Sequence, residues 1–546
     1  MKNNSKVDVC IVGSGVGGGV MAAELSAAGM SVVVLERGDE KSAADFMAQD
    51  ELTNIVRQDF FAADYQESQR SHSGERAQPG KYSLLAQTLG GSTVHWGAWS
   101  WRYRPDEMRQ LSREGPIEGA HVADWPISYA ELEPYYSRAE KVLGVSGLAG
   151  SNPFEARRSG QYPNPPHVYR PASRLIESGA SALGLTPFPS PLAINSRSFG
   201  GRAKCLNGGQ CSGFGCPVHA KASSLAIQLP AALATGNCQI LTGARALEIT
   251  LDEKGRASGV LYRSRGGSEH LVRARQVIVA CSSIASAQLL LLSRSSRFPN
   301  GLANSNDQVG RNLMCHVFSM VNFEMESESN HVIGPPGNVA IDDYHASNPE
   351  RGFSRGAVIC EAIDPLPIGM ALKAKNYLKG QRAWGQPLSD YLESYPKFGG
   401  MIAIGEDLPV NSNRVDLDPE HTDADGIPLS RITHTRHDND FKLAKYIEQR
   451  MVDIAEHGGA LKTWATDYTQ YKTASGHIMG TCRMGDDPET SVLNRWCQTH
   501  EVDNLWVVDG SFFPTSGGYN PTLTIFANAY RVAEHFIRQA KRLDLK

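Results

Sequence analysis

The sequence lacks the features that mark membrane-spanning and nucleic-acid-binding chains. No apolar run reaches the ~18 residues of a membrane helix. The 546 residues carry a formal net charge of −4, so the overall charge does not favour nucleic acid or an anionic membrane surface. Internal repeats and low-complexity tracts are also missing. What remains is an ordinary globular composition with about two to four domains at ~150 residues each.

The N-terminus has no recognisable targeting pattern. MKNNSKVDVCIVG (1–13) enters an apolar strand pattern almost at once, without a signal peptide or a twin-arginine leader. We therefore expect that the chain itself carries no export address.

Cysteine is present at ten positions, but only three of them cluster. Isolated cysteines in apolar patterns are typical small buried hydrophobes. Cys205, Cys211 and Cys216 instead form C-x5-C-x4-C-Pro. Clustered thiolates suit an iron–sulfur cluster or zinc. A structural zinc would need a fourth ligand, for which His219 is available, and a loop without metal is the third possibility.

The first forty residues contain a complete βαβ pattern. VDVCIV (7–12) is followed by Gly13, Gly15 and Gly18 in G-x-G-x-x-G register, then a helical stretch, then MSVVVLE (30–36), which closes on Glu36. These glycines would allow a tight turn, close approach of a pyrophosphate and helix–strand packing, while the acid would accept from ribose hydroxyls. The unit predicts a dinucleotide site; a glycine-rich turn without ligand is the alternative.

The remaining patterns predict an α/β protein, α+β overall. RQVIVACSSIASAQLLLLS (275–293) indicates a second strand, turn and helix of a nucleotide-binding fold, and 239–251 with 257–264 indicates a hairpin. Residues 127–145 predict an amphipathic helix with a proline break. Residues 40–85 predict a surface excursion or lid, with 66–81 the least ordered stretch.

Two domains are expected from these patterns. Strand-like alternation between 317 and 470, with a long helix at 440–459, predicts an antiparallel sheet inserted into a Rossmann-like domain. The Rossmann-like domain would be discontinuous, with residues 1–316 and 471–546, and would include the cysteine loop 205–216. The inserted substrate domain would be 317–470. Part of the connecting region 120–200 is a candidate to join it.

Two further stretches carry candidate chemistry. In LGGSTVHWGAWSWR (89–102), Gly90, Gly91 and Ser92 permit close backbone approach, and three tryptophans follow that could lie along a flat aromatic ring. The last seventy residues hold His477 in HIMGTCRMG and Asn520 in SGGYNPTLT. A histidine near its ordinary pKa of ~6.5 suits a general base at neutral pH, although a histidine chosen at random is more often structural.

Together these motifs resemble the glucose–methanol–choline flavoprotein oxidoreductases. The resemblance rests on the βαβ unit, LGGSTVHWGAWSWR, VGRNLMCH (309–316), HIMGTCRMG and VVDGSFFPTSGGYNPTLT (507–524). The His-Trp step, the Ser-Trp-Arg after it and the Cys-Pro ending are more similar to the flavin subunits of membrane-linked bacterial sugar dehydrogenases. These include fructose, gluconate and FAD-dependent glucose dehydrogenases, with glucoside 3-dehydrogenases nearby.

The resemblance implies FAD as cofactor and assigns the candidate residues. His477 takes the place of the family's base and Asn520 that of its partner, with hydride leaving a sugar carbon for the flavin. Asp509 and Gly510 match a second contact to the flavin ribityl-pyrophosphate. Pro521 and Thr522 would present a helix N-terminus to the flavin pyrimidine, where backbone N–H groups stabilise negative charge. Val34–Glu36 and the 239–247 strand are expected to border the adenosine.

Two assignments depart from the family pattern. Related pyranose oxidases bind flavin covalently through a histidine in Ser-Thr-His-Trp, whereas this chain has Ser-Thr-Val-His95-Trp. The shift leaves covalent attachment through His95 open. The cysteine pattern resembles the [3Fe-4S] site of glucose and fructose dehydrogenase subunits, but its last gap is one residue longer.

The sequence therefore predicts an FAD-dependent dehydrogenase that oxidises a sugar or glycoside hydroxyl. Electrons would pass through an iron–sulfur cluster to a cytochrome c or a quinone. The resemblance further implies a periplasmic protein exported by a small partner subunit, with cytoplasmic residence as the alternative. The rivals are an oxygen-using oxidase of the same fold and a non-catalytic subunit stabilised by FAD; a complete His477 and Asn520 pair disfavours the second.

Overall fold

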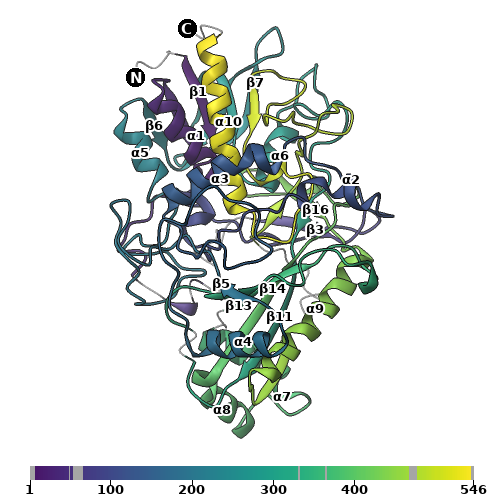
Figure 1. Ribbon diagram of the computed structural model, residues 1–546. Coiled ribbons are helices and arrows are strands. Elements are labelled where there is room, and N and C mark those ends of the chain that lie inside the picture. The colour runs from purple at the N-terminus through teal and green to yellow at the C-terminus, as the bar shows by residue number, and fades with distance from the viewer. Residues whose placement is uncertain are drawn as a thin grey trace.

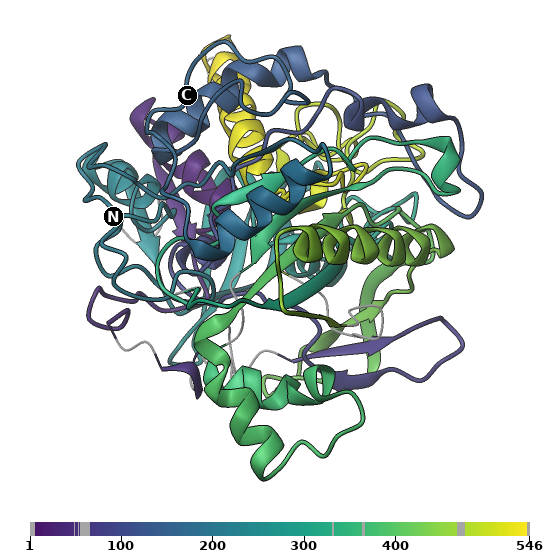
Figure 2. The same cartoon turned by 60° about the horizontal axis from the view of Figure 1, so that its bottom comes forward.

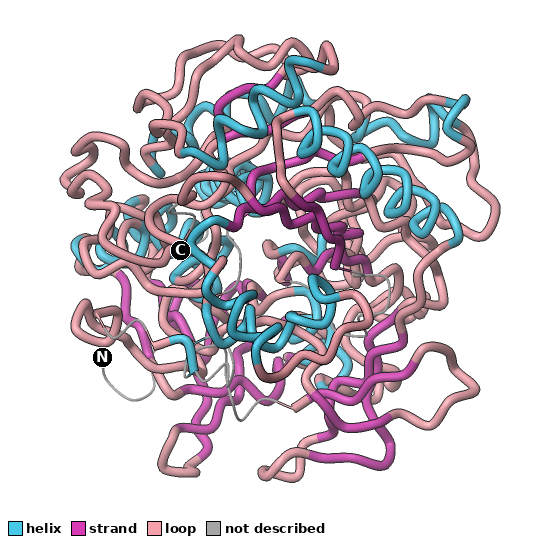
Figure 3. Tube along the Cα trace, turned by 90° about the horizontal axis from the view of Figure 1, so that it is seen from below, coloured by secondary structure: helices cyan, strands magenta, loops and turns pink. Residues whose placement is uncertain are grey.

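The computed structural model describes residues 6–47, 50–52, 54, 66–329, 332–362, 366–466 and 476–542. Two large sheets lie at opposite ends of the molecule (Figure 1). Both termini lie at one end, beside the first sheet, and helices α7 (Pro367–Leu378) and α8 (Gln386–Glu393) lie at the other. Long loops surround the sheets, as the view from below shows (Figure 3).

The first sheet is the predicted nucleotide-binding sheet. Its parallel strands pair in the order β6-β2-β1-β9-β19, and β7 and β8 extend β9 as an antiparallel meander. The strands are β1 (Val7–Val12), β2 (Val32–Leu35), β6 (Cys238–Leu241), β7 (Ala244–Leu251), β8 (Ala257–Ser264), β9 (Glu269–Val279) and β19 (Leu505–Val507). Continuous apolar runs such as VDVCIV form central strands because helices cover the sheet.

Helices from both ends of the chain pack against one another beside this sheet. The first βαβ helix, α1 (Val16–Ala27), contacts the C-terminal helix α10 (Thr522–Arg542) and the short α5 (Gln228–Ala234). Helix α6 (Ser283–Leu292) follows β9, as the sequence predicts. Helix α3 (Tyr129–Leu143) packs on α10. Pro134 lies inside α3 without ending it, contrary to the predicted break; a Ser128–Glu131 capping box and a buried face hold the helix.

The second sheet is antiparallel, as expected for the inserted region. Its order is β17-β11-β14-β13-β12-β5. The strands are β5 (Pro187–Pro189), β11 (Val317–Glu324), β12 (Val339–Ile341), β13 (Ala357–Ala362), β14 (Phe398–Gly405) and β17 (Lys462–Thr466). Helices α4 (Pro171–Ala182) and α9 (Asp438–His457) share a hydrophobic core with it. From the connecting region, α4 and β5 therefore pack with this sheet.

A smaller sheet corrects one sequence prediction. Residues 67–70 and 78–80 form strands β3 (Glu67–Arg70) and β4 (Gln78–Gly80), where the sequence predicted the least ordered loop. They join β15 (Arg414–Thr422) and β16 (Pro428–Thr433) in the order β15-β16-β3-β4. Glu67 is fully buried and accepts hydrogen bonds from Tyr82 and Ser83, so its polarity is satisfied inside the fold. Part of the predicted excursion, 48–49, 53 and 55–65, lies outside the described residues.

A two-stranded pairing, β10 (Met314–Cys315) with β18 (Ile478–Met479), joins the two halves near the centre of the molecule. The other regular elements are α2 (Gln110–Glu114) and short 3₁₀ turns at Gly91–Val94, Glu107–Arg109, Pro349–Arg351, Tyr395–Lys397 and Gly510–Phe512. Among the described helices, none is long and apolar enough to cross a membrane.

Candidate active site

A cavity of ≈ 590 Å³ is built from the two ends of the chain and the middle. The glycine turn and the end of β2 contribute to its walls, as do the start of α10 and strands β11 and β14 of the second sheet. The predicted residues in its lining are Gly13, Gly15, Glu36, Gly91, Ser92, His95, His477, Asp509, Gly510, Asn520, Pro521 and Thr522. Residues 471–475, which precede this histidine, lie outside the described residues.

The glycine turn leaves open space where a ligand backbone would approach. A Cβ on Gly15 would meet nothing within 4 Å. By contrast, a Cβ on Gly13 would lie 2.3 Å from the Ala280 carbonyl oxygen, and one on Gly18 would lie 1.9 Å from the Gly13 oxygen. Gly18 therefore allows packing and does not line the cavity. A pyrophosphate-binding turn requires this combination of one open glycine and two tightly packed ones.

Two buried carboxylates at the ends of strands hold the cavity walls. Glu36 Oε2 accepts from Ser14 N and Oγ at 3.1 and 2.6 Å, and its Oε1 accepts from Gly38 N at 2.8 Å. Asp509 accepts from Ser282 N at 3.0 Å and from the side chain of Ser286. Both carboxylates lie in the cavity lining, and both accept hydrogen bonds from backbone N–H groups of the surrounding turns.

The tryptophan-rich loop forms another wall. Gly90 has φ +91°, and a Cβ there would lie 2.7 Å from the Leu225 Cβ, so Gly90 serves the turn and is absent from the lining. A Cβ on Gly91 would lie 2.9 Å from the Gly15 Cα. His95 is buried in the lining, where burial and Lys221 lower its pKa to about 3. Its imidazole is therefore neutral at physiological pH.

The pairing of β10 with β18 brings two histidines together. Cys315 pairs with Ile478 in the antiparallel register, so His316 and His477, the next residues, are neighbours. Their Nδ1 atoms are 2.9 Å apart. Burial lowers the pKa of His316 to about 4, and burial together with His316 lowers the pKa of His477 well below its usual value. Both rings are neutral at pH 7.

Asn520 is held between an indole and the imidazole of His477. Trp101 Nε1 donates to Asn520 Oδ1 at 2.9 Å, and Asn520 Nδ2 lies 3.1 Å from His477 Nε2. An indole nitrogen can only donate, so the amide oxygen must face Trp101 and the amide nitrogen must face His477. His477 Nε2 is therefore an acceptor.

The contact of His477 with His316 leads to the same tautomer, in which Nε2 of His477 carries no proton. His316 Nε2 lies 3.3 and 3.1 Å from the carbonyl oxygens of Ser516 and Gly517, which can only accept. Neutral His316 therefore carries its proton on Nε2 and accepts at Nδ1, so His477 donates from Nδ1. Both arguments place the lone pair of His477 on Nε2, beside the Asn520 amide in the cavity lining.

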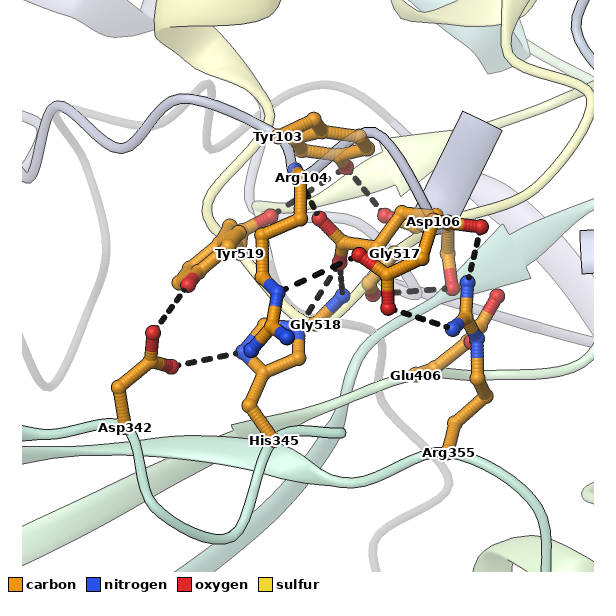
Figure 4. Close-up of polar contacts among 12 residues, drawn as sticks. Tyr103, Arg104, Asp106, Asp342, His345, Arg355, Glu406, Gly517, Gly518 and Tyr519 are labelled. Carbon is orange, nitrogen blue, oxygen red and sulfur yellow. Dashed lines mark hydrogen bonds and ion pairs between the residues drawn. The ribbon is translucent and has the colours of Figure 1, made fainter. Parts of the chain in front are cut away.

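A buried ionic network supports the loop before Asn520 (Figure 4). His345 contacts Asp342 through Nδ1 at 3.0 Å and Glu107 through Nε2 at 2.9 Å. Asp342 accepts from the Tyr519 hydroxyl at 2.6 Å, and Glu107 accepts from Gly518 N at 2.8 Å. Burial opposes charge on His345, but Glu107 and Asp342 outweigh it and raise its pKa to about 9. A histidinium thus links the second sheet to residues 518–519.

The cysteine loop lies against the same cavity. Ser212 and Gly213 line it, and Gly213 N donates to His95 O at 2.8 Å. The buried Lys221 ammonium donates to the carbonyl oxygens of Trp96, Cys211 and Phe214 at 2.9, 2.6 and 2.7 Å and fixes the loop to the tryptophan-rich wall.

The three cysteines of this loop form no disulfide. Among the described residues, the one set of three metal-ligating atoms within 4.8 Å is Cys315, Asp407 and His434. The ligand atoms of Cys205, Cys211, Cys216 and His219 are not gathered within that distance. In a cluster each thiolate binds a different iron, so tighter convergence is not needed.

Family comparisons agree with the motifs. The N- and C-terminal family models, each described as GMC oxidoreductase, match residues 15–318 and 409–529. The chain belongs to the GMC oxidoreductase family. It is an FAD-dependent oxidoreductase acting on CH–OH groups, which confirms the fold class and the enzyme class predicted from sequence.

Similar GMC proteins include both oxidases and dehydrogenases. The 6'''-hydroxyparomomycin C oxidase of Streptomyces lividus is 35% identical over 96% of this chain and 90% of its own. The gluconate 2-dehydrogenase flavoprotein of Pantoea cypripedii is 32% identical over 96% and 92%. A formate oxidase structure from Aspergillus oryzae, solved to study FAD modification, covers 100% of both chains with TM-score 0.68 and 13% identity, a likeness of fold.

The cavity fits FAD as this GMC enzyme requires. Gly15 leaves room for the pyrophosphate. Of the residues predicted to border the adenosine, Leu35, Glu36 and residues 244–246 line the cavity and would do so, whereas Val34 and residues 239–243 are not in its lining. Pro521 and Thr522 place the N-terminus of α10 in the lining, where unpaired N–H groups favour negative charge. When bound, FAD supplies the hydride acceptor.

Several residues of this GMC site had no role in the sequence prediction. His316 belongs to VGRNLMCH, and Trp101 to the tryptophan-rich stretch, but neither pattern indicates a partner. Tyr519 lies in SGGYNPTLT without an assigned role, and His345 belongs to no motif. Each acquires its role through a contact with a residue distant in sequence.

Proposed function

We propose that this enzyme is a dehydrogenase that oxidises a sugar or glycoside hydroxyl, with His477 as the base and Asn520 as its partner. The observation that carries the proposal is the defined tautomer of His477. Its Nε2 accepts and the amide nitrogen of Asn520 donates, 3.1 Å apart, both in the cavity lining. A substrate hydroxyl that approaches both nitrogens and replaces their mutual hydrogen bond can give its proton to His477 while its oxygen accepts from Asn520.

The sugar assignment is supported by relatives with sugar-derived names. Hydroxyparomomycin and gluconate name the substrates of two similar proteins. The cavity of ≈ 590 Å³ extends to the second sheet, where Phe318 of β11 and Ile402 and Ile404 of β14 line it. These side chains would contact the substrate and so select it.

We further propose that electrons leave through an iron–sulfur cluster on Cys205, Cys211 and Cys216 to a cytochrome c or a quinone. The contact of this loop with the flavin cavity supports the path, because electron transfer needs a short gap. The enzyme would then be periplasmic, exported with a small partner subunit. Two relatives support a multi-subunit assembly, because their names describe components of larger enzymes: gluconate 2-dehydrogenase flavoprotein and fructose dehydrogenase large subunit.

Anaerobic absorption spectra with a panel of sugars, glycosides and simple alcohols test the reaction. Bleaching of the flavin by a sugar and fast reoxidation by ferricyanide are expected. Fast reoxidation by oxygen alone would favour an oxidase instead. The similarity to 6'''-hydroxyparomomycin C oxidase is the observation that supports this alternative. No bleaching by any alcohol would contradict the catalytic proposal as a whole.

Metal analysis of protein made anaerobically tests the relay. About three irons per chain are expected for a three-iron cluster with three thiolates. Cys211→Ser should remove the iron and cytochrome reduction but leave flavin reduction intact, whereas Cys238→Ser, on β6 and outside the loop, should change neither. An iron-free wild-type protein would defeat the relay and leave the hydride-transfer proposal standing.

A further inference from the structure

The helical pair α7–α8 carries a surface that the enzyme's chemistry does not use. It lies at the end of the molecule opposite the termini (Figure 1) and extends away from the sheets (Figure 2). Its inner side is a separate small core in which α7 residues pack on residues of α8 and the second sheet: Met370, Ala374, Leu378, Tyr391, Phe398 and Trp464. The inner side therefore anchors the pair, and Glu51 also holds the start of α7 by accepting from Ile368 N at 2.8 Å and Gly369 N at 2.6 Å. Most of the outer side faces solvent.

The outer face of α7 combines apolar and basic side chains. Ile368, Leu372 and Lys375 follow one another at steps of four and three, which at 100° per residue places them on one stripe of the helix, and Lys379 follows as its C-cap residue. All four are exposed, and Leu372 is 70% exposed. The stripe lies opposite the buried face of α7, so it is available to a partner.

The loop after α7 continues the same character. Arg382 is exposed, and Trp384 is 64% exposed, an unusual position for a large aromatic residue. Between Leu366 and Ser389 the sequence contains four basic residues and no acidic one, in a chain whose net charge is −4. The net charge of the whole chain does not reveal this local excess of basic residues.

We propose that the outer face of α7 and the loop to Trp384 form a docking surface for an anionic lipid bilayer. Basic side chains attract acidic headgroups, and exposed leucine and tryptophan insert at the headgroup boundary. A projecting element that presents isolated apolar side chains suits insertion into a soft surface. A stable protein interface would instead require a complementary area of about 800 Å² on each partner. The enzyme thereby works at a membrane without a spanning helix.

Sedimentation of the FAD-loaded enzyme with vesicles tests the proposal. We expect binding to vesicles of phosphatidylcholine with phosphatidylglycerol, no binding to phosphatidylcholine alone, and release by high salt. Lys375→Gln, Lys379→Gln and Arg382→Gln together should weaken binding on the order of 100-fold, because each basic residue near an anionic surface contributes about fivefold. Leu372→Ser with Trp384→Ser should abolish binding. The difference between the fluorescence spectra of the wild type and of this variant, recorded with vesicles, should show a blue-shifted emission from Trp384.

Matched controls separate this surface from charge and hydrophobicity in general. Lys254→Gln, Lys442→Gln and Lys445→Gln remove three exposed charges elsewhere, and Val168→Ser with Leu233→Ser removes two exposed apolar side chains. Both control variants should bind as wild type, and all variants should keep flavin reduction by substrate. Equal binding of control and test variants would overturn the proposal, as would binding of polyglutamate but not of vesicles, or concentration-dependent self-association through the same residues.

Discussion

Trp101 donates a hydrogen bond of 2.9 Å to Asn520, although 419 residues separate the two in sequence. The indole also stacks on Tyr519, with ring centroids 5.6 Å apart. Because an indole cannot accept, this contact decides which end of the Asn520 amide faces His477. The orientation of the proposed catalytic pair therefore depends on a residue that has no part in the proposed proton transfer.

Removal of the proposed base should stop the reaction without loss of the cofactor. His477→Ala is expected to lower the rate of flavin reduction by ~10² to 10⁴, the usual cost of a lost general base. Asn520→Ala should lower it less. Stopped-flow flavin absorbance measures the rate, and the flavin content after gel filtration checks FAD binding. Near-normal reduction in His477→Ala would refute the assignment.

Loss of the indole donor should misorient Asn520. Trp101→Phe keeps an aromatic ring against Tyr519 but removes a hydrogen bond of about 1 kcal/mol, so a fall in kcat of about fivefold is expected with little change in KM. Trp125→Phe is the control, since the equally buried Trp125 donates instead to Thr515 at 2.8 Å. An equal loss of kcat in both variants would indicate a general effect on stability.

The acid limb of the rate profile should lie well below pH 6.5. His477 must be neutral to accept a proton, and burial with the neighbouring His316 lowers its pKa, so protonation begins only at acid pH. The rate of flavin reduction should therefore be flat from pH 6.5 to neutrality. Replacement of His316 by Gln should shift the limb upward by removing the neighbouring imidazole. A limb at or above pH 6.5 in the wild type would contradict the neutral, buried base.

The His345 ion network should make stability depend on alkaline pH. The folded pKa of about 9 exceeds the usual 6.5, so the stabilisation is complete below pH 6.5 and is lost as the pH rises through about 9. His345→Gln should lower the thermal midpoint at pH 6 and reduce its fall between pH 6.5 and 9. Glu406, whose pKa burial raises to about 7, adds a loss of the same sign that begins at lower pH. The exposed His457→Gln serves as control, and an unchanged pH slope in His345→Gln would disprove the role.

Local patterns were sufficient wherever the structure depends on neighbours in sequence. The βαβ unit, its glycines and Glu36 were predictable because a parallel strand–helix–strand unit imposes its rules within about thirty residues. The start of α10 after Pro521 follows from the same kind of rule. In contrast, β3 was missed because its sequence is polar and lacks strand alternation, and one of its two partners, β16, is more than 350 residues away.

The family, the nucleotide-binding half and the candidate pair His477 and Asn520 could all be identified from the amino-acid sequence. The arrangement of that pair could not, because it depends on contacts between distant segments. His316 comes to His477 through the β10–β18 pairing, and carbonyl oxygens of residues 516 and 517 fix its proton. Motifs specify which side chains are available. The position of a proton depends on donors and acceptors that meet only when distant segments pack together.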